Sequence, residues 1–164
     1  MDKKTFKKEV LSLLVRNARI STQEIANRLG ASEGEVLATI AELEKERVIV
    51  GYTAIVSDEA ESDEVRAIIE VAVQPERDTG FDNVAERLAR FPEVRSAYLV
   101  SGKYDLRLEV VGNSLQAVAS FVAGKLASQD GVKSCATYFL LKKYKESGVQ
   151  FAREEKHERL KIVP

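Results

Sequence analysis

The stretch that decides the fold of the first part of the chain spans residues 18–36 and reads ARISTQEIANRLGASEGEV. Residues 21–24 (Ser-Thr-Gln-Glu) have the spacing of a capping box, in which a serine caps a helix and a glutamate three residues later returns the bond. Residues 32–35 (Ser-Glu-Gly-Glu) repeat this pattern, and Gly30 stops the helix between them. Two capped helices joined by one short glycine turn predict a helix-turn-helix module.

The segments on either side complete this module. Phe6, Val10 and Leu14 recur at helical spacing and predict a helix before the turn. After the second capping box, Val36, Ile40 and Leu43 form the apolar stripe of a third helix. Residues 48–56 (VIVGYTAIV) are β-branched and aromatic, which predicts a strand or ribbon. The first part of the chain is therefore expected to be a winged-type helix-turn-helix, with three helices and a β-ribbon.

The second half alternates between strand and helix patterns. The expected strands cover residues 67–73, 94–100, 106–111 and 136–141, and the expected helices cover 81–88 and 115–126. The order is βαββαβ, the split arrangement of ferredoxin-like domains, so the fold class is α+β. Two helices cover only one face of such a sheet. An apolar open face on so small a domain predicts pairing with a second copy.

These patterns divide the chain into four parts. We expect a DNA-binding domain over residues 1–50, a ribbon and linker over 51–64, a ferredoxin-like effector and oligomerisation domain over 65–147, and a charged tail over 148–164. Hydrophobic residues make up 45% of the 164 residues and charged residues 31%, as in folded globular proteins.

Cysteine content and hydropathy limit where in the cell the protein is expected. The single cysteine, Cys135, can form no disulfide within the chain, which favours a reducing compartment. The start of the chain has no apolar core of a signal peptide, and no run approaches the roughly 20 apolar residues of a membrane span. A cytoplasmic location and no membrane partner are expected.

Double-stranded DNA is the partner that a helix-turn-helix predicts, although the net charge is only −1. Outward residues of the second and third expected helices are the candidate DNA contacts: Thr22, Gln23, Arg28, Ser32, Gly34, Ala38, Thr39, Glu42 and Lys45. Thr39 is a candidate for a thymine methyl group or a polar base edge, and Glu42 for the amino group of cytosine. The face is otherwise small or acidic, and acids repel phosphates. Positioning contacts are expected from the lysines and arginines of this part of the chain: Lys3, Lys4, Lys7, Lys8, Arg16, Arg19, Arg28, Lys45 and Arg47. A module retained only as scaffold is the alternative.

The motifs together resemble the leucine-responsive regulator/AsnC (Lrp/AsnC, feast/famine) family. The resemblance covers roughly residues 7–145 and includes, besides the stretches quoted above, residues 93–111 (EVRSAYLVSGKYDLRLEVV) and 131–142 (GVKSCATYFLLK). It implies a ligand-sensing (RAM) domain, dimers paired through their sheets, octameric discs in some members, and amino acids bound in clefts between dimers. Carried onto this chain, it implies an effector site at Ser101, Gly102, Tyr104, Asp105 and Thr137, with Asp105 facing the ammonium group or making an orienting hydrogen bond.

A plainer interpretation of the turn stays open, because a glycine with positive φ is common between antiparallel strands. Two other functions also stay open. Sirohaem decarboxylases resemble the same family, but residues 65–156 of this chain contain no histidine for such chemistry. The second alternative is a protein that modulates related regulators by forming mixed oligomers with them. His157, alone in the tail, is expected to be solvated, and no pattern predicts a catalytic residue, a metal site or a cofactor.

Overall fold

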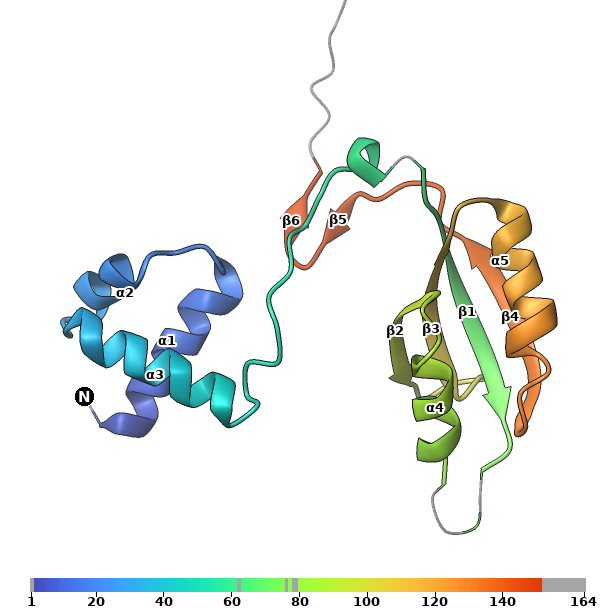
Figure 1. The fold of residues 1–164 in the computed structure, drawn as a ribbon, viewed down its shortest axis with the longest axis horizontal. Coiled ribbons are helices and arrows are strands. Elements are labelled where there is room, and N and C mark those ends of the chain that lie inside the picture. The colour runs from blue at the N-terminus through green and yellow to red at the C-terminus, as the bar shows by residue number, and fades with distance from the viewer. Residues whose placement is uncertain (1, 62, 76, 78–79, 152–164) are drawn as a thin grey trace, which may run out of the picture. The chain divides into compact units, whose positions relative to one another are not determined.

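The computed structural model describes residues 2–61, 63–75, 77 and 80–151, and it divides the chain into two compact units (Figure 1). The first unit spans Met1–Ala54 and the second Ile55–Pro164. Each unit has its own buried apolar core. No helix in the described part of the chain is long and apolar enough to cross a membrane.

The first unit contains three helices, α1 (Lys3–Arg16), α2 (Thr22–Leu29) and α3 (Glu33–Lys45). Their apolar stripes meet in one core, because residues three and four apart share a helix face. The residues buried in that core are Val10, Leu14, Ile25, Ala26, Val36 and Leu43. The three helices predicted from the sequence are confirmed.

The two predicted capping boxes differ in the structure. Ser32 and Glu35 form a complete box, in which the serine side chain accepts from the Glu35 backbone N–H and the Glu35 carboxylate accepts from the Ser32 N–H at 2.9 Å. Ser21 caps α2 by accepting from the Glu24 N–H at 3.1 Å. The Glu24 side chain instead pairs with Arg28 one turn along the helix, so this box is half formed.

The prediction of a ribbon over residues 48–56 is wrong, because the described chain has no strand there. After α3 the backbone turns at Arg47, which has a φ of 59°, and Ile49 packs against the core. Val48, Val50 and Tyr52 remain exposed. A strand needs a neighbour that accepts its backbone hydrogen bonds, and no other strand pairs with this segment in the described chain.

The second unit is a four-stranded antiparallel sheet in the order β2-β3-β1-β4 with two helices, which confirms the ferredoxin-like βαββαβ arrangement. Helices α4 and α5 both lie on one face of the sheet (Figure 1). The elements are β1 (Val65–Val73), α4 (Asp82–Ala89), β2 (Val94–Leu99), β3 (Leu106–Gly112), α5 (Leu115–Phe121) and β4 (Val132–Phe139).

Strand register separates the two faces of the sheet. Ile69 and Leu108 are fully buried under the helices, and they are partners across β1 and β3. Alternation along each strand turns the neighbours of these residues to the other face. The open face therefore carries two rows of cross-strand partners: Tyr138, Ile68 and Glu109 in the first, and Ala136, Glu70, Arg107 and Tyr98 in the second.

The structure differs from the expectation at three further places. β4 begins at Val132 and ends at Phe139 rather than covering residues 136–141, and Leu141 beyond it is 96% exposed. The expected helix over 115–126 changes after Phe121 into a π-helical turn (Val122–Leu126). A short hairpin of β5 (Lys145–Glu146) and β6 (Val149–Gln150) follows the sheet. Most of the predicted tail, including His157, lies outside the described residues.

Candidate functional site

Helix α3 presents small side chains on its outer face. Val36 and Leu43 point into the core of the first unit, and the 100° rotation per residue turns Gly34, Ala38 and Ala41 to the opposite side. These three residues are exposed, as is Lys45 at the C-terminal end of the helix. Gly34, Ala38 and Lys45 were predicted DNA contacts, and the structure brings them together in one stripe.

All four acidic residues of α3 are engaged within the first unit. Glu33 accepts a hydrogen bond from the Thr22 hydroxyl at 2.5 Å, and Glu35 accepts from Ser32 in the capping box. One carboxylate oxygen of Glu42 lies 3.0 Å from the ammonium nitrogen of Lys3 and of Lys7. Glu44 accepts from the Tyr52 hydroxyl at 2.9 Å. Of these four acids, Glu42 is the one held by ammonium groups, whereas Glu33, Glu35 and Glu44 accept from hydroxyl groups and keep their negative charge.

These contacts also set the ionisation of the acids. The hydrogen bonds from Lys7 and Lys3 lower the pKa of Glu42 below its usual value. The Ser32 backbone N–H and hydroxyl lower the pKa of Glu35 in the same way. Both carboxylates are therefore charged and occupied at neutral pH.

Three predicted DNA contacts lie off the outer stripe or are bonded within the first unit. Thr39 is only 8% exposed, because it lies on the inner side of α3 beside Val36 and Leu43. Glu42 lies toward α1, where the two lysines hold it, rather than on the outer stripe. Arg28 is paired with Glu24 at 2.5 Å. Thr22 and Gln23 lie in the first turn of α2, and Thr22 is linked to Glu33.

The basic residues of the first unit form two groups. Lys3, Lys7 and Arg28 are held by carboxylates. Among the described residues, no ion pair involves the others of the predicted positioning set, which are Lys4, Lys8, Arg16, Arg19, Lys45 and Arg47.

The predicted effector turn is built around Asp105. Its carboxylate accepts a hydrogen bond from the Val73 backbone N–H at 2.9 Å, and its own N–H donates to the Val71 carbonyl at 3.1 Å. Asp105 therefore fastens the end of β1 to the turn that contains Ser101, Gly102 and Tyr104. Gly102 does not have the positive φ that its place in the turn suggested, and a Cβ there would meet no atom within 4 Å.

The structure does not place Thr137 with this turn. The register pairs Thr137 with Ile69, which puts it on the helix-covered side of the sheet. Its neighbour Tyr138 lies on the open face, in the row next to that of Glu70. The negative charge of Glu70, with smaller effects of burial and of Tyr104, raises the pKa of the Tyr138 hydroxyl. Glu70 and Tyr138 were missed from the sequence, although strict alternation along each strand could have placed them on the open face.

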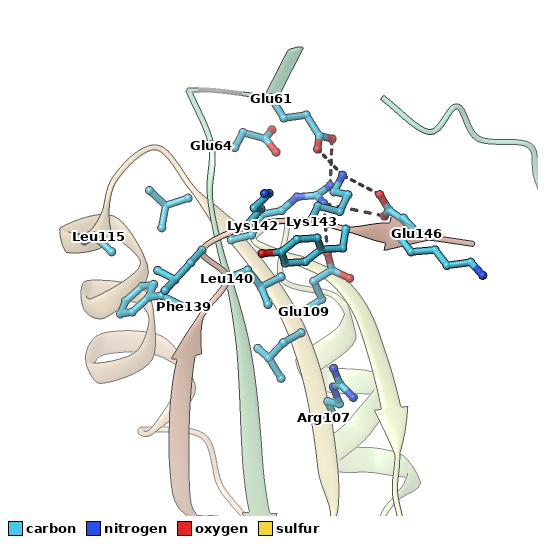
Figure 2. Close-up of a pocket in the computed structure, with 16 residues that line it drawn as sticks. Glu61, Glu64, Arg107, Glu109, Leu115, Phe139, Leu140, Lys142, Lys143 and Glu146 are labelled. Carbon is cyan, nitrogen blue, oxygen red and sulfur yellow. Dashed lines mark hydrogen bonds and ion pairs between the residues drawn. The ribbon is translucent and has the colours of Figure 1, made fainter. Parts of the chain in front are cut away.

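A groove of about 840 Å³ opens where β1 begins and β4 ends, at the other end of β1 from the Asp105 turn (Figure 2). Ile68, Phe139 and Leu140 contribute apolar surface to it. Arg66, of which 11% of the side chain is exposed, lies 3.0 Å from Glu61.

Lys143 completes this charge network at 3.1 Å from Glu61 and 2.7 Å from Glu146. Burial raises the pKa of Glu61, but Lys143, Arg66 and Arg95 outweigh it, so the pKa is lower than usual. Burial lowers the pKa of Lys143, and the hydrogen bonds to Glu146 and Glu61 outweigh that effect and raise it. The network ties the segment before β1 to the segment after β4.

Comparison with protein families matches both units. Residues 4–50 match a winged helix-turn-helix DNA-binding domain, and residues 66–150 match the Lrp/AsnC ligand-binding domain.

Individual relatives agree with these matches. An uncharacterised HTH-type transcriptional regulator of Bacillus subtilis is 44% identical over 160 residues, which is 95% of this chain and 95% of that protein. The leucine-responsive regulatory protein of Rhizobium meliloti is 30% identical over 139 residues, covering 85% of this chain and 89% of the other. A transcriptional regulator of Neisseria meningitidis, solved in complex with L-Met, superposes with a TM-score of 0.69 at 27% identity, covering 89% of this chain and 93% of the other. E. coli AsnC shares the fold, with a TM-score of 0.67 at 22% identity over 89% of this chain and 94% of that one.

Proposed function

The chain belongs to the Lrp/AsnC family of transcriptional regulators. From this premise we propose that it binds double-stranded DNA with α2 and α3. We further propose that an amino acid bound to its second unit changes the affinity for DNA. Family membership shows that the chain is a DNA-binding regulator with a ligand-binding domain. The DNA-contacting residues, the effector and the assembly are the proposal.

The observation that carries the DNA proposal is that the acids of α3 are bonded within the first unit and lie off its outer stripe. Phosphate neutralisation supplies most non-specific DNA affinity, and unpaired carboxylates beside the DNA would oppose it. Because the described helix carries small uncharged residues on this stripe, Gly34, Ala38 and Ala41 can approach the major groove. Lys45 and the unpaired cations of the unit then contact phosphates.

An amino acid is the effector class that we propose. The complex of the Neisseria regulator with L-Met supports this class, because that protein is 27% identical to this chain. Ser101, Gly102, Tyr104 and Asp105 are proposed to form one wall of the site. Asp105 acts there as an orienting group, since its carboxylate already holds the Val73 N–H. Thr137 is proposed to reach the site from a different chain, because its own register turns it away from Tyr138.

A homodimer or a larger ring, an octamer included, is the proposed assembly. The open sheet face carries Ile68, Tyr98 and Tyr138 beside charged Glu70 and Arg107, a mixture of aromatic, apolar and arginine side chains that is enriched in interfaces. Several modules in one assembly would bind adjacent DNA sites together, which raises the affinity of a module that is weak alone. A cytoplasmic location accompanies the proposed DNA partner.

Fluorescence anisotropy tests this proposal. The probe is a labelled duplex from upstream of the gene that encodes the chain, at about 50 and 200 mM salt, with and without a mixture of the common amino acids. We expect binding that weakens steeply with salt, because counterions are released from phosphates, and that shifts when an amino acid is present. Failure to bind this duplex and bulk genomic DNA at the lower salt would refute DNA recognition by this chain. Binding that ignores every amino acid would refute the effector proposal alone.

A further inference from the structure

The outer face of α3 has almost no hydrogen-bonding side chains, and this limits what it can recognise. Thr39 is buried, and the four glutamates of the helix are held by partners in the same unit. Ser32 at the N-cap both accepts from and donates to Glu35. Along the described helix, this leaves Lys45 as the charged donor on the outer face, and it lies in the last turn. In helix-turn-helix modules the N-terminal residues of this helix contact base edges.

What the face does offer at its N-terminal half is apolar. Leu37 is 53% exposed. It lies three residues after Gly34 and four residues before Ala41. Residues at this spacing are neighbours on a helix surface. Gly34, Leu37, Ala38 and Ala41 therefore form a continuous small and apolar surface, which we name the apolar stripe of α3.

The major groove has one apolar feature, the C5-methyl group of thymine, and small apolar side chains such as alanine contact it. We infer that the apolar stripe of α3 recognises thymine methyl groups, so that sequence preference comes from apolar contact rather than from hydrogen bonds to base edges. The inference rests on the proposed function, since it requires α3 to enter the major groove. The small side chains at Gly34, Ala38 and Ala41 let the helix approach closely, and Leu37 reaches farthest.

The expected size follows from the area that a methyl group buries. Each methyl group taken out of water improves affinity by roughly fourfold. Two methyl contacts in each module would give a preference of about tenfold or more for thymine over uracil at the same positions.

Four 40-base-pair duplexes test this inference with the full chain, at about 50 mM salt: alternating A·T, the same sequence with every thymine replaced by uracil, alternating G·C, and G·C with every cytosine methylated at C5. Uracil differs from thymine only in the missing methyl group. We expect the A·T duplex to bind at least fourfold tighter than its uracil form. We also expect methylated G·C to bind more tightly than plain G·C, because its methyl group occupies the matching position in the groove.

A pair of variants locates the effect on α3. Leu37→Ala keeps the helix, because leucine and alanine both favour helices and the side chain is half exposed. We expect this variant to lower the thymine-to-uracil ratio at least twofold. Val15→Ala removes an exposed apolar side chain from α1 and should leave the ratio unchanged.

The possible failures are distinct. Equal binding of the thymine and uracil duplexes, or a ratio that Leu37→Ala leaves intact, would overturn the inference while the DNA-binding proposal stands. No binding to any of the four duplexes would overturn both.

Discussion

The fold leaves two faces open, one on each unit, and their side chains differ in kind. The apolar stripe of α3 is small, and the acids of the helix are bonded to neighbours in their own unit. The open sheet face is large, aromatic and charged, with Tyr98, Tyr138, Glu70 and Arg107 along two strand rows. A small face suits close approach to a groove, whereas aromatic and arginine side chains suit a protein partner. The difference supports the proposal that the two faces bind different classes of partner.

The two units also handle their carboxylates differently. In the first unit, the carboxylates of Glu33, Glu42 and Glu44 form their hydrogen bonds and ion pairs near the surface. Glu61 of the second unit bonds in a partly enclosed groove with Arg66, Lys143 and Arg95. Exposed pairs contribute little to stability, and enclosed ones are costly to break.

The largest effect is expected from truncating the aromatic side chains of the open sheet face. The double substitution of Tyr98→Ala and Tyr138→Ala removes two side chains that are more than half exposed in the single chain. If a second copy covers this face, the dissociation constant of the dimer should rise about thirtyfold, which corresponds to about 2 kcal/mol at an aromatic hot spot. Sedimentation velocity over a range of concentrations measures it. Val15→Ala on α1 is the control, and an unchanged dimer in the double variant would show that this face is not the interface.

Removing Glu61 tests the charge network of the groove. Glu61→Ala leaves Arg66, Lys143 and Arg95 without their shared acid, while Glu146 and Glu109 remain near Arg66. Losing one partner of a buried pair costs about 3–5 kcal/mol, and the residual exposure and remaining acids reduce this to about 2 kcal/mol. Urea unfolding followed by circular dichroism measures the loss. Glu86→Ala in α4, where the carboxylate is 72% exposed and 3.9 Å from Arg90, should change stability by less than about 0.5 kcal/mol.

The same residue predicts a pH dependence. Because the pKa of Glu61 is lower in the folded chain than its usual value of 4.5, its contribution to stability is complete above pH 4.5. That contribution is lost as the pH falls from 4.5 through the lower folded value. Glu61→Gln should therefore be less sensitive to pH in this range than the unaltered chain. If the stability of Glu61→Gln and of the unaltered chain changed in parallel below pH 4.5, the role assigned to Glu61 would be contradicted.

A smaller effect is expected at the cap of α3. Ser32→Ala removes the side chain that accepts from the Glu35 N–H, and N-cap losses of this kind cost about 1 kcal/mol. The loss should appear in the thermal unfolding of the first unit. Ser32→Asp, which also accepts at an N-cap, should recover most of it. A full loss in the aspartate variant would mean that the capping bond is not the cause.

The smallest effect concerns the acids beside the apolar stripe. Glu42→Gln releases Lys3, leaves Lys7 bound to Glu46, and removes one negative charge. DNA affinity should rise a few-fold, and its dependence on salt should become steeper. Glu86→Gln in the second unit removes the same charge far along the chain and serves as the control. Equal gains in both variants would attribute the effect to net charge alone.

The sequence predicted most of the fold because its local signals were consistent. The capping residues Ser21 and Ser32 begin α2 and α3, and alternation placed β1, β2 and β3 to within about two residues. The segment 48–56 has strand composition, but the strand did not form, because a strand depends on a partner that composition does not specify.

The positions of the candidate site residues were predicted less well, because contacts between distant residues decide them. Thr39 and Glu42 are near the outer face by sequence, yet packing buries the first and α1 holds the second. Thr137 follows the family motif, but the strand register turns it to the covered face. Glu61 meets Lys143 through the sheet and not through any local pattern.

Hydroxyl-radical footprinting of the full chain, read by mass spectrometry, tests the division between the two faces most directly. The reporters are Leu37 on α3 and Tyr98 and Tyr138 on the sheet, all of them exposed in the single chain. We predict that an A·T-rich duplex protects Leu37 and leaves the tyrosines unchanged, and that raising the protein concentration protects the tyrosines and leaves Leu37 unchanged. Protection of the tyrosines by DNA, or a Leu37 that DNA does not protect, would contradict the assignment of α3 to DNA and of the sheet to a second copy.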